Sequence, residues 1–183
     1  MNRLLLDSAS YGIVGADLEG RTIFVNRAAT TMLGFDANEL LGHVGHDLFH
    51  ADCAGRGANC RLQQVAANGQ ALTVDDEFFR RKGGSRFPVE YSTHAIIRRG
   101  ETIGVVTIFL DITIRKKIEA QTKQYEAIVQ SSDDAIIGKS LDGKVTSWNP
   151  GAEAMFGYSA VEMLGRPLRA ILPEDRVGEE DFI

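Results

Sequence analysis

The sequence predicts an α+β protein, in which a five-stranded antiparallel sheet carries helices over one face and is followed by a linker helix and a partial second domain. Three observations support this prediction. Strand-type segments come in two groups, two short and then three long, with helix-type segments between them. After residue 113 the apolar period changes to one of about 3.5 residues. The front of the chain then repeats at a constant offset.

The repeat pairs residues 7–49 with residues 130–172, without gaps and 123 positions apart, and 13 of the 43 pairs are identical. An offset of this length exceeds a solenoid period, so the repeat indicates a duplicated domain. About 65 residues follow the repeated part in the first copy, against 11 in the second. We therefore expect four parts: an N-terminal helical cap (1–10), a complete domain (7–113), a linker helix (114–129) and the N-terminal half only of a second domain (130–183).

The first copy starts with strand and helix signals in close succession. Segments 12–16 and 22–25 flank a turn that contains glycine and predict a hairpin. Asn26 is a suitable N-cap for a helix over 27–33, which Gly34 ends. Asp36 then caps a short helix over 37–41, and segment 60–67 predicts a further helix.

Three longer strands are expected over 72–80, 86–98 and 102–113, joined by turns at 82–85 and 99–101 that contain glycine. Alternation of apolar and polar residues is weak in the last two, so both faces of this sheet should be partly covered.

The linker helix has apolar or long side chains at spacings of 4, 3, 4 and 3 residues, namely Ile114, Ile118, Gln121, Tyr125 and Ile128. This spacing is typical of a coiled-coil seam. Two interpretations remain open: the helix packs back on its own domain, or it pairs two copies of the chain. We expect a homodimer formed through the linker and N-terminal helices, although about two heptads alone are marginal.

The second copy repeats the order of the first. Strands are expected over 135–139 and 145–148, followed by a helix that Asn149 caps and Pro150 opens. Gly157 ends that helix, and a short helix over 160–164 follows. The three long strands have no counterpart, so we expect residues 130–183 to lack a complete core of their own.

Composition excludes several classes of protein. The net charge is −5 and the basic residues are scattered, so we expect no nucleic-acid partner. The apolar run at 103–110 is too short to span a bilayer, and the start of the chain is not a secretory signal. Two cysteines do not form a disulfide framework. We therefore expect a cytoplasmic protein with no membrane segment in this part.

Motifs in both copies resemble the PAS (sensory-box) superfamily. They lie at 17–21, 26–29, 34–35, 39–42, 78–91 and 103–113, and the last of them ends in Asp111-Ile112-Thr113. The resemblance implies a sensing or dimerising module of bacterial histidine kinases, cyclic-di-GMP enzymes and related regulators, with a downstream output domain in the parent protein. It also implies that the Asp111–Thr113 junction passes changes in a pocket into the linker helix.

The resemblance also assigns residues to these roles. A small-molecule pocket in the first domain would be walled by Phe24, Met32, Phe35, Leu48, Phe79, Tyr91 and Phe109. The alternative is that these residues fill the core. The relay would use Asp111, Thr113, Ile114, Ile118, Tyr125 and Ile128. Asp111 and Thr113 can each accept hydrogen bonds from helix N–H groups, so a shift of the last strand would move the start of the helix.

Cofactor signals are present but badly placed. Residues 57–64 resemble the Gly-x-Asn-Cys-Arg-x-x-Gln string of flavin-binding LOV photosensors, but the family position of the reactive cysteine falls on Gly45. His46, His50, Cys53 and Cys60 could together hold a tetrahedral metal, although their spacing is not a standard zinc pattern. The histidine nearest to a haem-ligand position is His50.

We therefore expect no tightly bound cofactor, with haem, flavin and metal as the alternatives. His94 is expected to be a structural or surface residue of a strand, and the acidic run 75–77 a solvated sheet edge.

Taken together, these features predict a sensory and relay region without a catalytic site of its own. The first domain would sense a small ligand or mediate dimerisation. Two other functions stay open. One is a dimerisation spacer that binds no ligand, and the other is a metal- or haem-based redox or gas sensor at His46, His50, Cys53 and Cys60.

Overall fold

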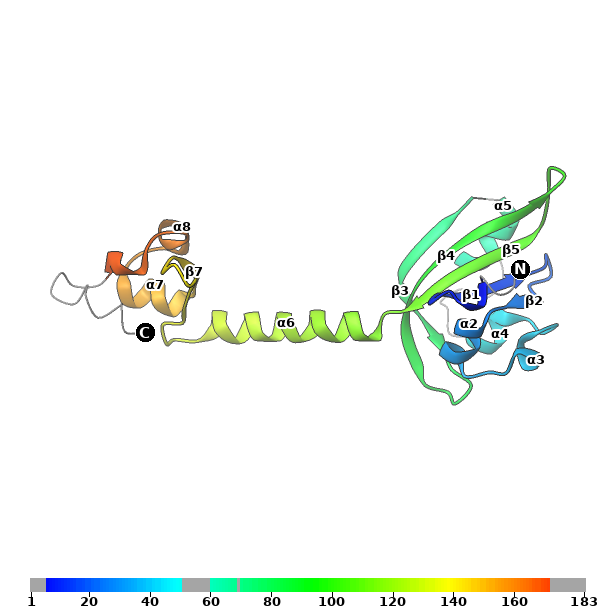
Figure 1. Cartoon of the computed structure of the whole chain (residues 1–183), viewed down its shortest axis with the longest axis horizontal. Helices are drawn as coiled ribbons and strands as arrows, with labels where there is room; N and C mark the ends of the chain where they lie inside the picture. The colour runs from blue at the N-terminus through cyan, green and yellow to red at the C-terminus, as the bar shows by residue number, and fades with distance from the viewer. Residues whose placement is uncertain (1–5, 51–59, 69, 172–183) are drawn as a thin grey trace. The chain divides into compact units, whose positions relative to one another are not determined.

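The computed structural model describes residues 6–50, 60–68 and 70–171 (Figure 1). The chain forms two compact units, divided between Lys117 and Ile118. No helix of the described residues is long and apolar enough to cross a membrane.

The first unit is a five-stranded antiparallel sheet, and the described residues between its second and third strands form four short helices. In chain order its elements are β1 (Gly12–Ala16), β2 (Thr22–Val25), α2 (Arg27–Leu33), α3 (Ala37–Leu40), α4 (Gly45–Phe49), α5 (Arg61–Asn68), β3 (Leu72–Arg80), β4 (Arg86–Arg98) and β5 (Glu101–Asp111). The strand order is β2-β1-β5-β4-β3, and the helices gather against the sheet (Figure 1). This confirms the predicted α+β class and strand count.

The core lies between the sheet and these helices, and Phe79 is at its centre. The Phe79 ring centroid is 5.2 Å from that of Phe49, 5.3 Å from Phe109 and 5.5 Å from Tyr91. The ring of Phe109 lies directly over Gly12, where any Cβ would overlap it. A residue without a side chain is therefore needed at that point of β1.

A bulge in β3 decides which of its side chains face the core. Val74 pairs with Tyr91, but the next core-facing pair is Glu77 with Val89, so β3 contains one extra residue. Strand side chains alternate between faces, so the extra residue reverses the alternation. Glu77 and Phe79 consequently face the helices, whereas Phe78 is 53% exposed.

Several boundaries differ from those expected. Strand β5 ends at Asp111, and the linker helix α6 (Thr113–Ser131) begins one residue before 114 and ends two after 129. Helix α4 was not predicted, because its N-cap Val44 has no side-chain hydrogen bond and gives no capping signal. Of the expected N-terminal cap, residues 1–5 lie outside the described residues, and the chain is helical at Leu6 and Asp7.

The second unit contains β6 (Ile137–Lys139) and β7 (Val145–Trp148), which pair as a two-stranded sheet, and then α7 (Pro150–Phe156), α8 (Ala160–Met163) and a 3₁₀ helix, η2 (Leu168–Ile171). Strand β6 is two residues shorter than expected at its start. In the described part of this unit, 118–171, the buried core contains Val145, Trp148, Ala152 and Met163. Large apolar side chains such as Met155 and Val161 remain mostly exposed.

One buried asparagine holds the same junction in each unit. Asn26 Oδ1 accepts hydrogen bonds from the backbone N–H of Ile13 (2.9 Å) and Ala29 (3.0 Å), and its Nδ2 donates to the carbonyls of Leu6 and Tyr11 (2.9 Å each). The side chain thus caps α2 and fixes the first strand and the segment before it.

Asn149 repeats this arrangement in the second unit. Its Oδ1 accepts from Ile136 N (2.8 Å) and Ala152 N (2.9 Å), and its Nδ2 donates to the carbonyls of Asp134 and Val129. The duplication therefore preserves a specific hydrogen-bonding role as well as a strand order.

Replacing Asn26 by alanine should destabilise the first unit by about 2–4 kcal/mol, because the change removes the N-cap of α2 and leaves buried backbone groups without partners. Chemical denaturation followed by far-ultraviolet circular dichroism measures this loss. The fluorescence of Trp148, the single tryptophan of the chain, reports the second unit. The denaturation midpoint that Trp148 fluorescence reports should be unchanged in Asn26→Ala and lower in Asn149→Ala. Equal effects of both variants on the Trp148 transition would contradict the assignment.

Candidate functional site

A cavity of about 210 Å³ lies where the ends of β1 and β2 meet α4, α5 and the middle of β5. Its apolar wall consists of Val14, Val44, Phe49, Leu62 and Val105. Its polar wall residues include Thr22, His46 and Thr107, and Asp17 and Glu19 belong to the same lining. An apolar wall with a few polar groups is typical of small-molecule sites.

Thr22 is the unusual member of this wall. Its side chain is buried, at 2% exposure, and its Oγ1 has no hydrogen-bond partner among the described residues. By contrast, the Thr107 hydroxyl is 3.0 Å from that of Thr93, so these two satisfy each other. An unsatisfied buried hydroxyl is costly, and Thr22 therefore marks a position where a ligand or water could supply the missing hydrogen bond.

None of the seven residues predicted for the pocket lines this cavity. Phe79, Tyr91 and Phe109 are almost fully buried in the core, and Met32, Phe35 and Leu48 pack against it. Phe24 pairs with Gly15 and so lies on the opposite face of the sheet from its buried neighbour Val25. The expected pocket residues thus form core rather than cavity wall, apart from Phe24, which is outside the core cluster.

A buried polar network adjoins the cavity. The Nε2 of His50 is 2.7 Å from Glu77 Oε2, and the Tyr91 hydroxyl donates to the same oxygen at 2.8 Å. Burial and the neighbouring Glu77 raise the pKa of the Tyr91 phenol well above its usual range, so Tyr91 stays a donor. The Nε of Arg61 lies 3.5 Å from Glu77 Oε1. Glu77 is thus part of a partly buried network, and the expectation that the whole run 75–77 is solvated is wrong at this residue.

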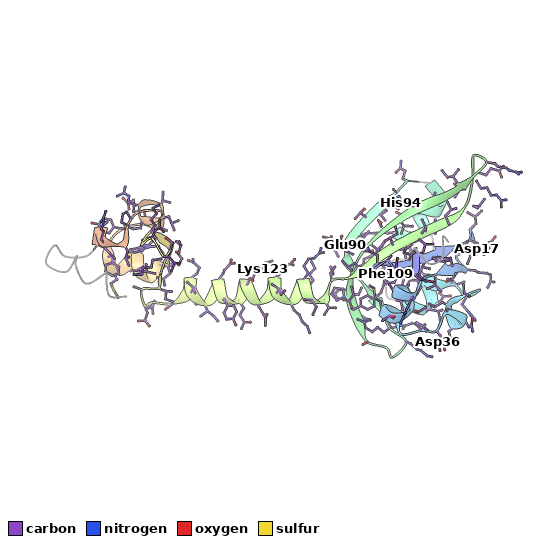
Figure 2. All side chains as sticks on the ribbon, viewed as in Figure 1. Asp17, Asp36, Glu90, His94, Phe109 and Lys123 are labelled. Carbon is purple, nitrogen blue, oxygen red and sulfur yellow. The ribbon has the colours of Figure 1, made fainter. Side chains whose placement is uncertain are left out.

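Three of the four candidate metal ligands come together. One ligand atom from each of His46, His50 and Cys60 lies within 4.8 Å of the other two, and the Sγ of Cys60 is 3.6 Å from the Nδ1 of His50. Cys53 lies outside the described residues. A haem iron at His50 would have to displace either Glu77 or Cys60, which does not favour haem ligation. His94 is exposed on β4, as expected of a surface residue (Figure 2).

The strand-to-helix junction is built around Asp111. Its Oδ1 accepts hydrogen bonds from the Thr113 backbone N–H (2.9 Å) and hydroxyl (2.5 Å). Its Oδ2 is 2.5 Å from the guanidinium of Arg81. Burial raises the pKa of the Asp111 carboxyl, but the hydrogen bonds from Thr113 and the Arg81 ion pair outweigh it, so the pKa lies below its usual value. Contrary to expectation, Thr113 donates here rather than accepts.

Arg81 connects this junction to the helices. Its guanidinium also donates to the carbonyl oxygen of Met32 in α2 and lies over the ring of Phe87, 4.1 Å from the centroid. Sequence reasoning missed Arg81, Glu77 and Thr22. A charged residue in a turn, an acidic run and a strand threonine are ordinary surface signals, and only the three-dimensional register sets these three apart.

Helix α6 has no buried residue, and the apolar relay positions on it are open to solvent. Ile114, Ile118, Tyr125 and Ile128 are exposed by 69%, 58%, 68% and 56%. Four large apolar side chains at coiled-coil spacing on one helix form an apolar stripe along it.

Comparison with known proteins agrees with this architecture. Residues 6–117 match one family described as the PAS fold, and residues 123–182 match a second family of the same description. The chain is 25% identical over 166 residues to the signal transduction histidine-protein kinase AtoS of Escherichia coli, covering 86% of this chain and 24% of AtoS. It is 24% identical over 181 residues to the uncharacterized protein y4lL of Sinorhizobium fredii, covering 96% of this chain and 22% of that protein. The chain therefore spans about a quarter of the length of these curated relatives.

Solved structures give the same fold. An RNA-binding light-oxygen-voltage receptor matches with a TM-score of 0.57 at 22% identity, over 68% of this chain and 36% of that one. The PAS domain of a Colwellia psychrerythraea protein matches with a TM-score of 0.52 at 21% identity, over 62% and 96%. That of nitrogen regulation protein NR(II) from Vibrio parahaemolyticus gives 0.51 at 17% identity, over 61% and 98%. At these identities the similarity shows the fold alone. The chain belongs to the PAS family, and it carries a PAS sensory domain similar to those of histidine kinases.

Proposed function

We propose that this chain is the sensory and relay region of a bacterial signal-transduction protein whose output domain is a histidine kinase or a cyclic-di-GMP enzyme. The first PAS domain binds a small organic molecule in the cavity between β1, β2, α4 and α5. The change passes along β5 into α6. The observation that carries the proposal is the buried Thr22 hydroxyl, which has no hydrogen-bond partner among the described residues and lies in the wall of a mainly apolar cavity.

The cavity restricts the class of ligand. A volume of about 210 Å³ is below the range of drug-sized ligands, so it fits a molecule of a few heavy atoms. The apolar wall favours a hydrocarbon body, and Thr22 favours one hydroxyl or carbonyl group at its surface. Asp17 and Glu19 in the same lining disfavour an anion.

Strand β5 links this cavity to the linker helix. Val105 and Thr107 line the cavity, and four residues after Thr107 the strand reaches Asp111, which holds the first residue of α6. Ile112, between Asp111 and the first residue of α6, is 2% exposed, and its backbone N–H donates to the carbonyl of Pro88 at 3.0 Å. A displacement of β5 by a ligand is therefore transmitted to α6 through residues that are buried or hydrogen-bonded.

Arg81 provides a second route to the same point, because it binds both the carboxyl end of α2 and Asp111. A movement of the helices around the cavity therefore displaces the Asp111 carboxylate, as a movement of β5 does.

The apolar stripe on α6 supports a dimer as the receiving element. A parallel second copy would cover Ile114, Ile118, Tyr125 and Ile128, and the output domains would then be held as a pair. Two heptads are marginal on their own. The pairing of the two helices is therefore weak, and a small movement at Asp111 is enough to change the alignment of one helix against the other.

The valine variant of Thr22 tests the cavity. Thr22→Val removes the hydroxyl with little change of shape, so the unliganded protein should be as stable or slightly more stable. We expect phenol, used as a probe, to bind about tenfold more weakly to the variant, because one hydrogen bond of about 1–1.5 kcal/mol is lost. Toluene, which matches phenol in shape, should bind both proteins equally. Protein NMR titrations measure both affinities.

The matched control is Thr73→Val, which removes an exposed hydroxyl on β3. If phenol bound neither protein, or bound Thr22→Val as tightly as the wild type, Thr22 would not be the anchor.

The junction has a pH signature. The pKa of Asp111 in the folded protein lies below the unfolded value of about 3.9, so its ionised form stabilises the fold above about pH 4. This contribution disappears as the pH falls through the lower, folded pKa. We expect Asp111→Asn to be about 1–2 kcal/mol less stable than wild type at pH 7, with the difference shrinking in acid. Asp75→Asn, at an exposed position on β3, should show no such difference. A stability difference between wild type and Asp111→Asn that does not change with pH would contradict this role.

Substitutions in the apolar stripe on α6 test whether the chain forms a dimer through this helix. Replacing Ile118 and Tyr125 together by glutamate should weaken self-association at least tenfold, because it puts charges at the seam. The control, with Ala120 and Ala127 both replaced by glutamate, adds the same charge at exposed positions away from the seam. Sedimentation equilibrium measures both. Equal weakening by the two double variants would argue against a seam.

A further inference from the structure

The buried cluster beneath the cavity has the composition of a metal centre. His46 lies in the first turn of α4, and His50 is the C-cap residue that follows the helix, with its backbone N–H bonded to the carbonyl of His46. Cys60, immediately before α5, brings a thiol to them from the other end of the segment between the helices. The two imidazole centroids are 5.5 Å apart.

The distances fit tetrahedral coordination. In a tetrahedral zinc site with Zn–S of about 2.3 Å and Zn–N of about 2.0–2.1 Å, the sulfur and nitrogen ligands are about 3.6 Å apart. The Sγ of Cys60 and the Nδ1 of His50 are 3.6 Å apart. The three ligand atoms of the cluster lie within 4.8 Å of one another, so the imidazole of His46 would have to move towards the other two to complete the set.

Glu77 supplies the outer partner that ligating histidines need. A carboxylate accepts hydrogen bonds, so its contact with His50 Nε2 places the ring proton on that nitrogen and directs the lone pair of Nδ1 towards Cys60. Metal-bound histidines usually donate their other N–H to such a carboxylate. The Tyr91 hydroxyl and the Arg61 guanidinium in turn hold Glu77 in place.

Burial and charge also agree with a metal site. His50 and Cys60 are each 1% exposed, whereas His46 is partly exposed in the cavity wall and gives a metal a way in. A divalent ion with one thiolate and two neutral imidazoles carries one net positive charge, which Glu77 offsets. Three protein ligands leave one position for water or a small ligand, as in open zinc sites.

We propose that His46, His50 and Cys60 bind a divalent transition metal of the zinc class, with Glu77 positioning His50. On binding, the Cys60 S–H bond breaks and its proton goes to solvent, a sulfur–metal bond forms, and the oxidation state of the metal does not change. The proposal does not depend on the organic ligand proposed for the cavity.

Cobalt titration of the full chain tests this site. After treatment with a chelator under reducing conditions, the protein is titrated with Co²⁺, which reports thiolate ligation through a charge-transfer band in the near ultraviolet. We expect one Co²⁺ per chain, displaced by Zn²⁺. Cys60→Ser should abolish the band, and His46→Ala and His50→Ala should each weaken binding at least tenfold. Glu77→Gln should weaken binding about 10–100-fold while keeping the band.

The exposed histidines provide the controls, because His43→Ala and His94→Ala should bind Co²⁺ like the wild type. Cys53 is kept in every variant. Circular dichroism of the metal-free proteins checks that each variant folds. His46 is the least buried of the three ligands, so His46→Ala is the variant whose folding should be least disturbed. Absence of the band in the wild type overturns the proposal, as does a band that persists in Cys60→Ser.

Discussion

The first unit depends on the need to satisfy buried backbone groups where β1, α2 and the preceding segment meet. Asn26 meets that need with a single side chain that accepts two hydrogen bonds and donates two. Apolar packing alone could not fix this geometry, because it has no direction. Once the junction is fixed, Gly12 lies beneath Phe109 and β5 is aligned beside β1. The cavity, the buried cluster and the junction at Asp111 are all built on that alignment.

The two proposed sites differ in chemistry but share one wall. His46 belongs to the lining of the cavity and to the group formed with His50 and Cys60. Events at either site therefore act on α4, and both lie against strands that lead to Arg81 or Asp111. In this arrangement a metal would tune the response to an organic ligand, because it would fix the position of one wall residue. The two proposals nevertheless rest on separate residues, Thr22 for the cavity and Cys60 for the metal.

The sequence predicted the strands, most of the short helices and their order along the chain, because each depends on local signals such as the caps Asn26 and Asn149 and the glycines that end helices. The order of the strands within the sheet was not predicted, because it depends on pairing between distant segments. Helix α4 was missed because Val44 offers no capping side chain. The site was predicted less well. His46, His50 and Cys60 were recognised by residue type, but Thr22, Glu77 and Arg81 depend on which face a side chain takes and on contacts across long separations. The expected pocket residues proved to be mainly core, since apolar type cannot distinguish a filled interior from a cavity wall.

The bulge in β3 has an evolutionary consequence. The strand pairs with β4 on both sides of the extra residue, so loss of one residue between Val74 and Glu77 would leave these pairs intact and keep Glu77 and Phe79 on the inner face. Only a slip of the whole segment after Val74 by one residue along β4 would turn Phe78 inwards and remove the partner of His50. Related domains can therefore gain or lose this residue at the edge strand and still keep the polar interior, so a gap in an alignment at this point does not indicate its loss.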